Sequence, residues 1–233
     1  MCITSLKVNM LGGLSIRSGD VEINDGDNRS RKVWLLLAYM IYCRKRPITQ
    51  EELVRLLWDD GDSVTNPANA LKTMFHRVRT TLDRLGDSAG HVLIVRQGGS
   101  YAWNCKVPLT LDVEAFDELC QSASDATRPK DRLERCLKAL ELYGGDFLEH
   151  FSSDPWVVPV AAYYHNVYLQ VTHEVLPMLE EADRREEAAL LCRQAIQLDP
   201  YCEELYWHLM RNLLDLERQK EAIVVYEEVT QLL

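Results

Sequence analysis

The 233-residue sequence predicts an α+β domain over residues 1–106 followed by an all-α domain over residues 107–233. Residues 1–106 alternate short β-rich runs with three helical segments, whereas strand signals nearly stop after Lys106. Residues 1–106 carry a net charge of +4, from 15 Lys and Arg against 11 Asp and Glu. Residues 107–233 carry −14, from 11 Lys and Arg against 25 Asp and Glu. This asymmetry indicates two domains with different partners, although solvated surfaces on both halves would also produce it.

The composition excludes several classes of protein. A chain with 47% hydrophobic and 27% charged residues buries enough surface to fold, which excludes intrinsic disorder. The longest apolar run, Val33–Cys43, is shorter than the roughly 20 residues that a membrane span needs, and the N-terminus has no signal-peptide pattern. Seven cysteines without a CxxC pair are typical of a cytoplasmic protein with no disulfide framework. We expect neither a metal nor a cofactor, and no membrane partner.

A small antiparallel sheet is predicted at the N-terminus. Alternating apolar and polar residues run through 6–10, 14–17 and 21–23, with glycine-containing turns between them. A first, strongly apolar helix follows at Val33–Cys43 and ends before Pro47. The sequence therefore predicts strands that lead directly into a helical unit.

Two further helices have clear start signals. In the second, Thr49 is the expected N-cap and Glu52 its capping-box partner, and the helix runs to Trp58. In the third, Asn66 is the expected N-cap with Pro67 at the first helical position, and the helix ends at Gly86.

The third helix has two contrasting faces. Its apolar stripe has alternating spacings of four and three residues: Leu71, Phe75, Val78, Leu82 and Leu85. The remaining surface carries small polar and cationic side chains: Asn69, Lys72, Thr73, His76, Arg77, Arg79, Thr80 and Arg84. Arginine bonds guanine, a threonine methyl contacts thymine, and lysine or histidine contacts phosphate. This face suits a DNA major groove, and an ordinary amphipathic surface helix is the alternative.

A β-hairpin is predicted after the helices. The runs His91–Arg96 and Tyr101–Trp103 are joined by Gly98-Gly99. Three helices followed by a hairpin form a winged helix-turn-helix, whose wing reaches phosphate or the minor groove. Arg96 and Ser100 would lie on that wing, although the hairpin could instead only close the sheet.

Residues 6–103 resemble the OmpR-like winged helix of SARP-type transcriptional activators, the antibiotic-regulatory-protein family. The matching pieces are Leu11–Leu14, Leu35–Ala38, Ile48–Leu53 with Leu57-Trp58, Asn69–Leu71, Arg77–Arg79 with Leu82, and Gly99–Tyr101. The resemblance implies that two protomers bind tandem repeats of double-stranded DNA as a homodimer. It also implies that an acidic loop contacts RNA polymerase or its sigma factor through Asp59, Asp60 and Asp62, which could equally form a solvated turn.

The sequence of residues 107–233 predicts a helical repeat. Helices are expected from Asp112 to Cys120, around Leu133–Leu142, and from Asp154 toward Val171. The stretches 179–188 and 213–222 match at an offset of 34, which is the tetratricopeptide (TPR) period. Between them, Asp199-Pro200 with Glu203 reads as a helix start. An undistinguished helical bundle is the alternative.

The same half resembles the bacterial transcriptional activator domain (BTAD) that follows the winged helix in SARP-type proteins. The matching pieces are 111–116, 143–148, 154–157, 195–200 and 209–210. Because Leu233 falls inside an amphipathic helix where the family usually continues, we expect the chain to be truncated at its C-terminus.

The sequence favours a regulator over an enzyme. It has no P-loop, HExxH or GxSxG motif, and we expect no cysteine or serine nucleophile near His165 or His173. We expect a cytoplasmic, sequence-specific DNA-binding transcriptional activator. The alternatives are a repressor or ligand-sensing regulator of the same fold, and a TPR-like protein-interaction adaptor.

Overall fold

The computed structural model describes residues 4–27, 30–58 and 65–232, and the chain forms two compact units. The first unit comprises Met1–Glu114 and a short later segment, Leu148–Phe151. The second unit comprises Ala115–Phe147 and Ser152–Leu233. The limit near residue 114 lies C-terminal to the 106–107 boundary expected from the sequence, which as a division of function stays a prediction.

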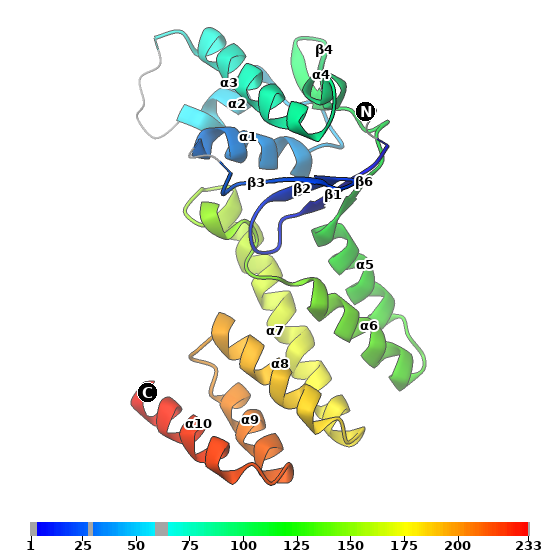
Figure 1. Ribbon diagram of the computed structural model, residues 1–233, viewed down its shortest axis with the longest axis vertical. Helices are drawn as coiled ribbons and strands as arrows, with labels where there is room; N and C mark the ends of the chain where they lie inside the picture. Colours follow the sequence, from blue (N-terminus) through cyan, green and yellow to red (C-terminus); the bar gives the residue numbers. More distant parts are fainter. Residues whose placement is uncertain (1–3, 28–29, 59–64, 233) are drawn as a thin grey trace. The chain divides into compact units, whose positions relative to one another are not determined.

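The first unit contains a four-stranded sheet (Figure 1). Its strands are β1 (Leu6–Asn9), β2 (Ser15–Ser18), β3 (Val21–Asn24) and β6 (Leu109–Leu111), in the order β3-β2-β1-β6. The pairs β1–β2 and β2–β3 are antiparallel, as predicted. Strand β6 pairs with β1 in parallel and was not predicted, because three residues are too few to show an alternating pattern.

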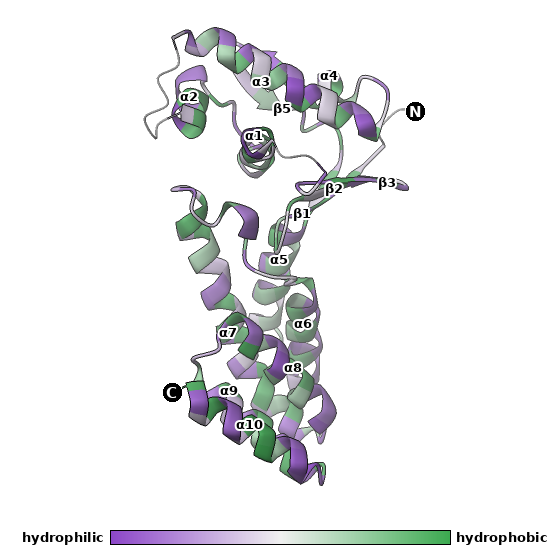
Figure 2. Cartoon of the chain, turned by 60° about the vertical axis from the view of Figure 1, so that its left-hand side comes forward, coloured by the Kyte–Doolittle hydropathy of each residue, from purple (hydrophilic) through white to green (hydrophobic). Residues whose placement is uncertain are grey.

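The first unit also contains three helices that pack together. They are α1 (Arg31–Tyr42), α2 (Gln50–Trp58) and α3 (Pro67–Leu82), and α3 continues as a 3₁₀ turn to Leu85. Helix α1 lies between the sheet and the pair α2–α3 in both views (Figures 1 and 2), which explains why it is apolar almost all round. Trp34 and Met40 are buried in it.

The hairpin forms next to α3, with one difference from the expectation. Strands β4 (Ile94–Gln97) and β5 (Ser100–Trp103) pair antiparallel, but His91–Leu93 belong to a short helix, α4 (Ala89–Leu93). The expected strand over His91–Arg96 is therefore wrong in its first half. Asp83 accepts a hydrogen bond from the Gly90 N–H, and a Cβ at Gly90 would lie 2.4 Å from the Arg79 Cα. This close helix contact requires glycine.

At the start of α2 the predicted N-cap is present, but the predicted capping box is not. The Glu52 N–H donates to the Thr49 hydroxyl at 3.2 Å, which confirms the N-cap. The Glu52 carboxylate does not complete a capping box, because it accepts hydrogen bonds from the Tyr39 hydroxyl and the Arg46 guanidinium instead. Those hydrogen bonds hold the pKa of Glu52 below its usual range, and burial raises the pKa of Tyr39. Glu52 therefore connects the ends of two helices.

The second unit is all helical and TPR-like. Its elements are α5 (Asp112–Ser124), which begins in the first unit, α6 (Pro129–Leu142), α7 (Val157–Glu181), α8 (Arg185–Leu198), α9 (Glu203–Asp215) and α10 (Gln219–Leu232). Figure 1 shows α7–α8 and α9–α10 as successive helical hairpins, the two copies of the predicted repeat. A 3₁₀ turn at Glu149–Phe151 belongs to the first unit.

The two repeat turns have the same backbone geometry. Asp183 and Glu217, which are 34 positions apart, both have positive φ, at 57° and 59°. The Arg184 N–H donates to the Leu179 carbonyl at 2.9 Å, and the equivalent bond from Arg218 measures 2.8 Å. These bonds satisfy carbonyl groups at the helix ends in the manner of a Schellman motif. The period of 34 read from the sequence is confirmed at the level of single backbone bonds.

Three predicted helix starts in this half differ. Helix α7 begins at Val157, so the expected start at Asp154 is three residues too early. Helix α9 begins at Glu203 with Cys202 as its N-cap, so the expected start at Asp199-Pro200 is wrong. Asp112 begins α5 rather than capping it from outside, and its carboxylate accepts the N–H groups of Met10 and Leu11 at 2.7 and 2.8 Å. Burial raises the pKa of Asp112. No helix in the described ranges is both long and apolar enough to cross a membrane.

Candidate nucleic-acid interface

Helix α3 is fixed by its apolar stripe and its N-terminus. Asn66 accepts a hydrogen bond from the Asn69 N–H at 3.0 Å, as the predicted cap requires, and Pro67 occupies the first turn. All the predicted stripe residues are buried, and Met74 and Thr81 are buried with them. Figure 2 shows hydrophilic and hydrophobic residues alternating along α3. The remaining face is therefore held outward by a rigid helix.

The exposed face of α3 collects most of the predicted site residues. Six of them are exposed to solvent: Asn69, Lys72, Thr73, His76, Arg77 and Thr80. Over residues 4–27, 30–58 and 65–232, neither Lys72 nor Arg77 forms an ion pair. Arg84 differs, because its guanidinium pairs with Asp27 at 2.8 Å. Relative to the described residues, the face thus presents two cations that remain available to anions from outside.

The two threonines of this face are locally ordered. Thr73 donates its hydroxyl hydrogen to the Asn69 carbonyl at 3.1 Å, and Thr80 donates to the His76 carbonyl at 3.0 Å. Each bond restricts the side chain to one orientation. The methyl group and the oxygen lone pairs remain available to a ligand, which is what contact with a base edge requires.

Arg79 is placed differently from the other site residues. It is half-buried, and its guanidinium donates to the Ile94 carbonyl at 3.3 Å, at the start of β4. Its backbone is the surface against which Gly90 packs. The Arg79 Nε is buried without a hydrogen-bond partner among the residues that the structure describes. Arg79 therefore connects α3 to the hairpin.

The wing is anchored at its tip and along its length. Gly98 and Gly99 have φ of +56° and +86°, as a two-residue hairpin turn of this type needs. The Gln50 side chain donates to the Gly99 carbonyl at 2.8 Å. The Tyr101 ring stacks on Phe75 of α3, with ring centroids 3.6 Å apart. These contacts give the wing a fixed position on the helical unit.

The two predicted wing residues lie on this anchored hairpin. Arg96 is exposed, and its guanidinium carbon lies 5.6 Å from the centroid of the Tyr101 ring, a cation–π distance. Ser100 is half-exposed and pairs with Gln97 in the strand register. The contacts from Arg96 to Tyr101 and from Tyr101 to Phe75 join the wing to α3. The predicted polymerase-contact residues Asp59, Asp60 and Asp62 lie outside the described residues.

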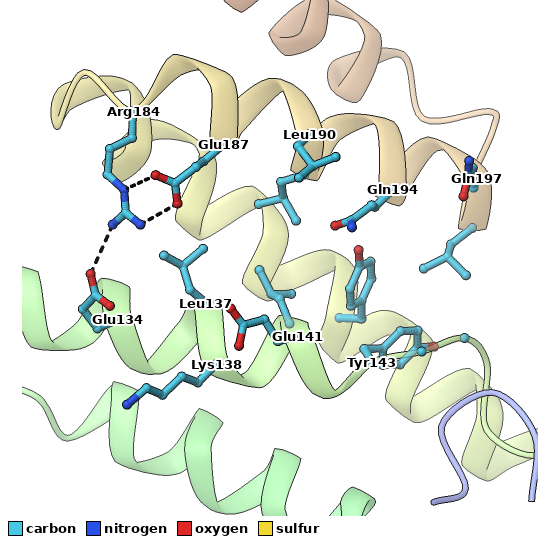
Figure 3. Close-up of a pocket in the computed structure, with 16 residues that line it drawn as sticks. Glu134, Leu137, Lys138, Glu141, Tyr143, Arg184, Glu187, Leu190, Gln194 and Gln197 are labelled. Atoms are coloured by element: carbon cyan, nitrogen blue, oxygen red, sulfur yellow. Dashed lines mark hydrogen bonds and ion pairs between the residues drawn. The ribbon is translucent and has the colours of Figure 1, made fainter.

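The second unit has a cavity that the sequence did not reveal. It measures about 650 Å³ and lies between α6 and α8, with Tyr168 of α7 among the lining residues. Figure 3 shows Leu137, Leu190, Gln194 and Tyr143 around it, and Arg184 bonded to Glu134 and Glu187 at one end. Tyr143 and Tyr168 stack with centroids 4.4 Å apart. No motif indicates this cavity, because its lining comes from helices distant in sequence.

The fold and the exposed face define a class: a winged helix-turn-helix domain followed by a TPR-like helical domain. Residues 111–233 match the family model described as the bacterial transcriptional activator domain. Because this match covers more than half of the chain, the chain belongs to that family, and the SARP-type resemblance read from the sequence is confirmed. This family is one of transcriptional regulators. No curated protein matches the sequence.

A solved structure shares the fold. It is that of EmbR from Mycobacterium tuberculosis, determined in complex with a low affinity phosphopeptide. The TM-score is 0.68 at 18% sequence identity, and the match covers 96% of this chain. The chain spans 58% of the EmbR chain. At this identity the likeness supports the arrangement of the fold alone.

Proposed function

We propose that this protein is a sequence-specific DNA-binding transcriptional activator that inserts α3 into the major groove. The observation that carries the proposal is the exposed face of α3, with Lys72 and Arg77 outside any ion pair among the described residues. Thr73, His76, Arg77 and Thr80 would contact base edges, and Lys72 and Arg96 would contact phosphates. Asn69 and Ser100 would add polar contacts from the start of α3 and from the wing.

The coupling of helix and wing supports the same proposal. The hydrogen bond from Arg79 to the Ile94 carbonyl and the stacking of Tyr101 on Phe75 hold the two strands of the wing against α3. A DNA backbone beside the groove would then meet Arg96 at a fixed distance from the recognition helix. We assign Arg79 to this coupling, and its remaining guanidinium hydrogens can also face a phosphate.

The net charge of +4 over residues 1–106 supports few phosphate contacts per protomer. Moderate affinity for one half-site follows, so we propose that two protomers bind tandem repeats. Recruitment of RNA polymerase or its sigma factor would use the acidic loop with Asp59, Asp60 and Asp62, together with the acidic second half. Both DNA and polymerase as partners imply a cytoplasmic location.

Selection from a pool of random double-stranded DNA tests this proposal. The wild-type protein should enrich a directly repeated motif, and the double variant Lys72→Ala with Arg77→Ala should enrich none. The double variant Arg128→Ala with Lys130→Ala is the control, since it makes the same charge change on an exposed surface of the second unit. The selected site should then raise transcript yield in vitro; a lower yield would instead indicate a repressor.

One observation favours a second candidate function. The cavity between α6 and α8 has an apolar wall, and the exposed amide of Gln194 lies beside it, which suits a protein segment. A protein-interaction adaptor would use this cavity in place of the α3 face. It would enrich no DNA motif, and the charge variants of α3 would leave its interactions unchanged.

A further inference from the structure

A cysteine, a histidine and a glutamate from separate elements meet in the second unit. The Cys202 Sγ lies 3.8 Å from the Nε2 of His173, and the His173 Nδ1 lies 3.6 Å from a carboxylate oxygen of Glu204. His173 belongs to α7, whereas Cys202 and Glu204 belong to the start of α9. The expectation that no cysteine lies near His173 is therefore wrong. The sequence hid this arrangement because 29 residues separate the thiol from the imidazole.

This arrangement has the parts that activate a thiol. The imidazole can take the thiol proton at Nε2, and the carboxylate beside Nδ1 favours the resulting imidazolium. The His173 Nδ1 is buried and has no hydrogen-bond partner among the described residues, so nothing there competes with Glu204 for its hydrogen. Cys202 itself is partly exposed, which leaves a path for a small reagent.

The other described cysteines lack these features. Burial raises the pKa of Cys43, Cys120 and Cys136, and raises that of Cys192 to about 12. Cys105 is exposed, but its thiol donates a hydrogen bond to the Arg44 carbonyl at 3.2 Å and has no imidazole beside it among the described residues. Among the cysteines that the structure describes, reactivity is thus expected at Cys202, and Cys105 is a natural internal reference for it.

We propose that Cys202 is a nucleophilic thiol activated by His173, and that hydroperoxides oxidise it to a sulfenic acid. The thiol proton passes to His173 Nε2, and the sulfur attacks one peroxide oxygen. A sulfur–oxygen bond forms while the oxygen–oxygen bond breaks. The leaving group, hydroxide from hydrogen peroxide or alkoxide from an organic hydroperoxide, takes the proton from His173 and departs as water or alcohol. Sulfur loses two electrons and the peroxide gains them. Glu204 acts as a positioning residue for the imidazole.

The place of Cys202 gives this oxidation a structural consequence. Cys202 is the N-cap of α9, and its side chain makes no capping hydrogen bond. A sulfenic oxygen there is an acceptor that can bond a free N–H group of the first turn, as the oxygen of an N-cap serine does. Oxidation would therefore stabilise the start of the helix that begins the second repeat.

The first experiment measures thiol reactivity in the full chain under native conditions. Iodoacetamide labelling, quantified for each cysteine by mass spectrometry, should modify Cys202 about tenfold faster than Cys105. His173→Ala should bring Cys202 down to the rate of Cys105, and added imidazole should restore part of the loss. His165→Ala is the matched control, because His165 is also on α7 but bonds Asp146.

The second experiment tests oxidation and the positioning role. After treatment with hydrogen peroxide, dimedone should trap a sulfenic acid at Cys202 and not at Cys105. Glu204→Gln should reduce the labelling rate by less than His173→Ala does, without changing the melting temperature. Equal rates at Cys202 and Cys105, or an unchanged rate in His173→Ala, would overturn the activation. Rapid labelling by iodoacetamide without a dimedone adduct would overturn the assignment of hydroperoxide as reagent.

Discussion

The outward face of α3 and the helical repeats use their charged residues in opposite ways. In the helical second unit, which contains the repeats, arginines are held by carboxylates, as in the pairs Arg132–Glu174, Arg184–Glu187, Arg193–Glu221 and Arg218–Glu221. On α3, Lys72 and Arg77 meet no carboxylate among the residues that the structure describes. The pairs Arg132–Glu174 and Arg193–Glu221 join different helices, and the other two lie within one helical turn. Paired charges thus belong to the helical framework, whereas unpaired charges are free for a ligand. Substitutions should therefore affect stability in one region and binding in the other.

Glu180→Ala should give the largest effect, a loss of about 3 kcal/mol in the free energy of unfolding, because it leaves buried polar groups unpaired. Glu180 is 8% exposed and accepts hydrogen bonds from His208 and Asn212, both at 2.8 Å. Urea unfolding measures the loss, and Glu186→Ala is the control, since Glu186 is exposed. A loss below about 1 kcal/mol would contradict the buried role.

The same cluster predicts a pH dependence. Burial alone would raise the pKa of Glu180, but the hydrogen bonds from His208 and Asn212 hold it below its usual range. Its contribution to stability is therefore complete above the pKa of an unfolded glutamate and is lost as the pH falls through the lowered folded pKa. Glu180→Ala should remove this acid-side dependence.

Arg77→Ala should weaken DNA binding rather than stability. We expect a loss of about 1–3 kcal/mol in binding free energy at a selected DNA site, with relaxed specificity there. Unfolding should change by less than about 0.5 kcal/mol, because Arg77 is exposed. Titration with labelled duplexes measures the first quantity and urea unfolding the second. Arg128→Ala, an exposed arginine of the second unit, controls for lost charge. Unchanged affinity and selectivity would disprove the assignment of α3.

Arg193→Ala should have a small effect, a loss of about 0.5 kcal/mol or less in the free energy of unfolding, because both partners are exposed. Its guanidinium lies 3.1 Å from the Glu221 carboxylate, and the two side chains are 43% and 45% exposed. The loss should disappear at high salt. A large, salt-independent loss would show that the pair does more than fix register.

The smallest expected effect on stability comes from the protonation of His150, which lies in the first unit. The hydrogen bond to Asp25 at 3.0 Å raises the pKa of His150 above its ordinary value. The resulting stabilisation is complete below the pKa of an unfolded histidine and is lost as the pH rises through the raised folded pKa. An NMR titration of the ring protons should show the raised pKa, and Asp25→Asn should return it to the ordinary range.

Local sequence patterns predicted the elements whose signals lie within one segment. The cap at Asn66, the buried stripe from Leu71 to Leu85 and the offset of 34 each depend on neighbours along the chain, and each is confirmed. Elements set by distant partners were missed. Gly90 lies in a short helix that packs closely on Arg79, and the buried Asp112 carboxylate accepts the Leu11 N–H just after β1. Cys202 meets His173 only after two helices have packed.

The first unit has a consequence for how the chain is made. It is completed by Leu148–Phe151, where the Leu148 N–H donates to the Met10 carbonyl and the Glu149 N–H to the Gly12 carbonyl, both at 2.8 Å. During synthesis these residues leave the ribosome well after α3 and the wing. The N-terminal unit must therefore wait, incomplete, until α5 and α6 have been translated. A nascent chain stalled before residue 148 should remain sensitive to protease in its N-terminal sheet.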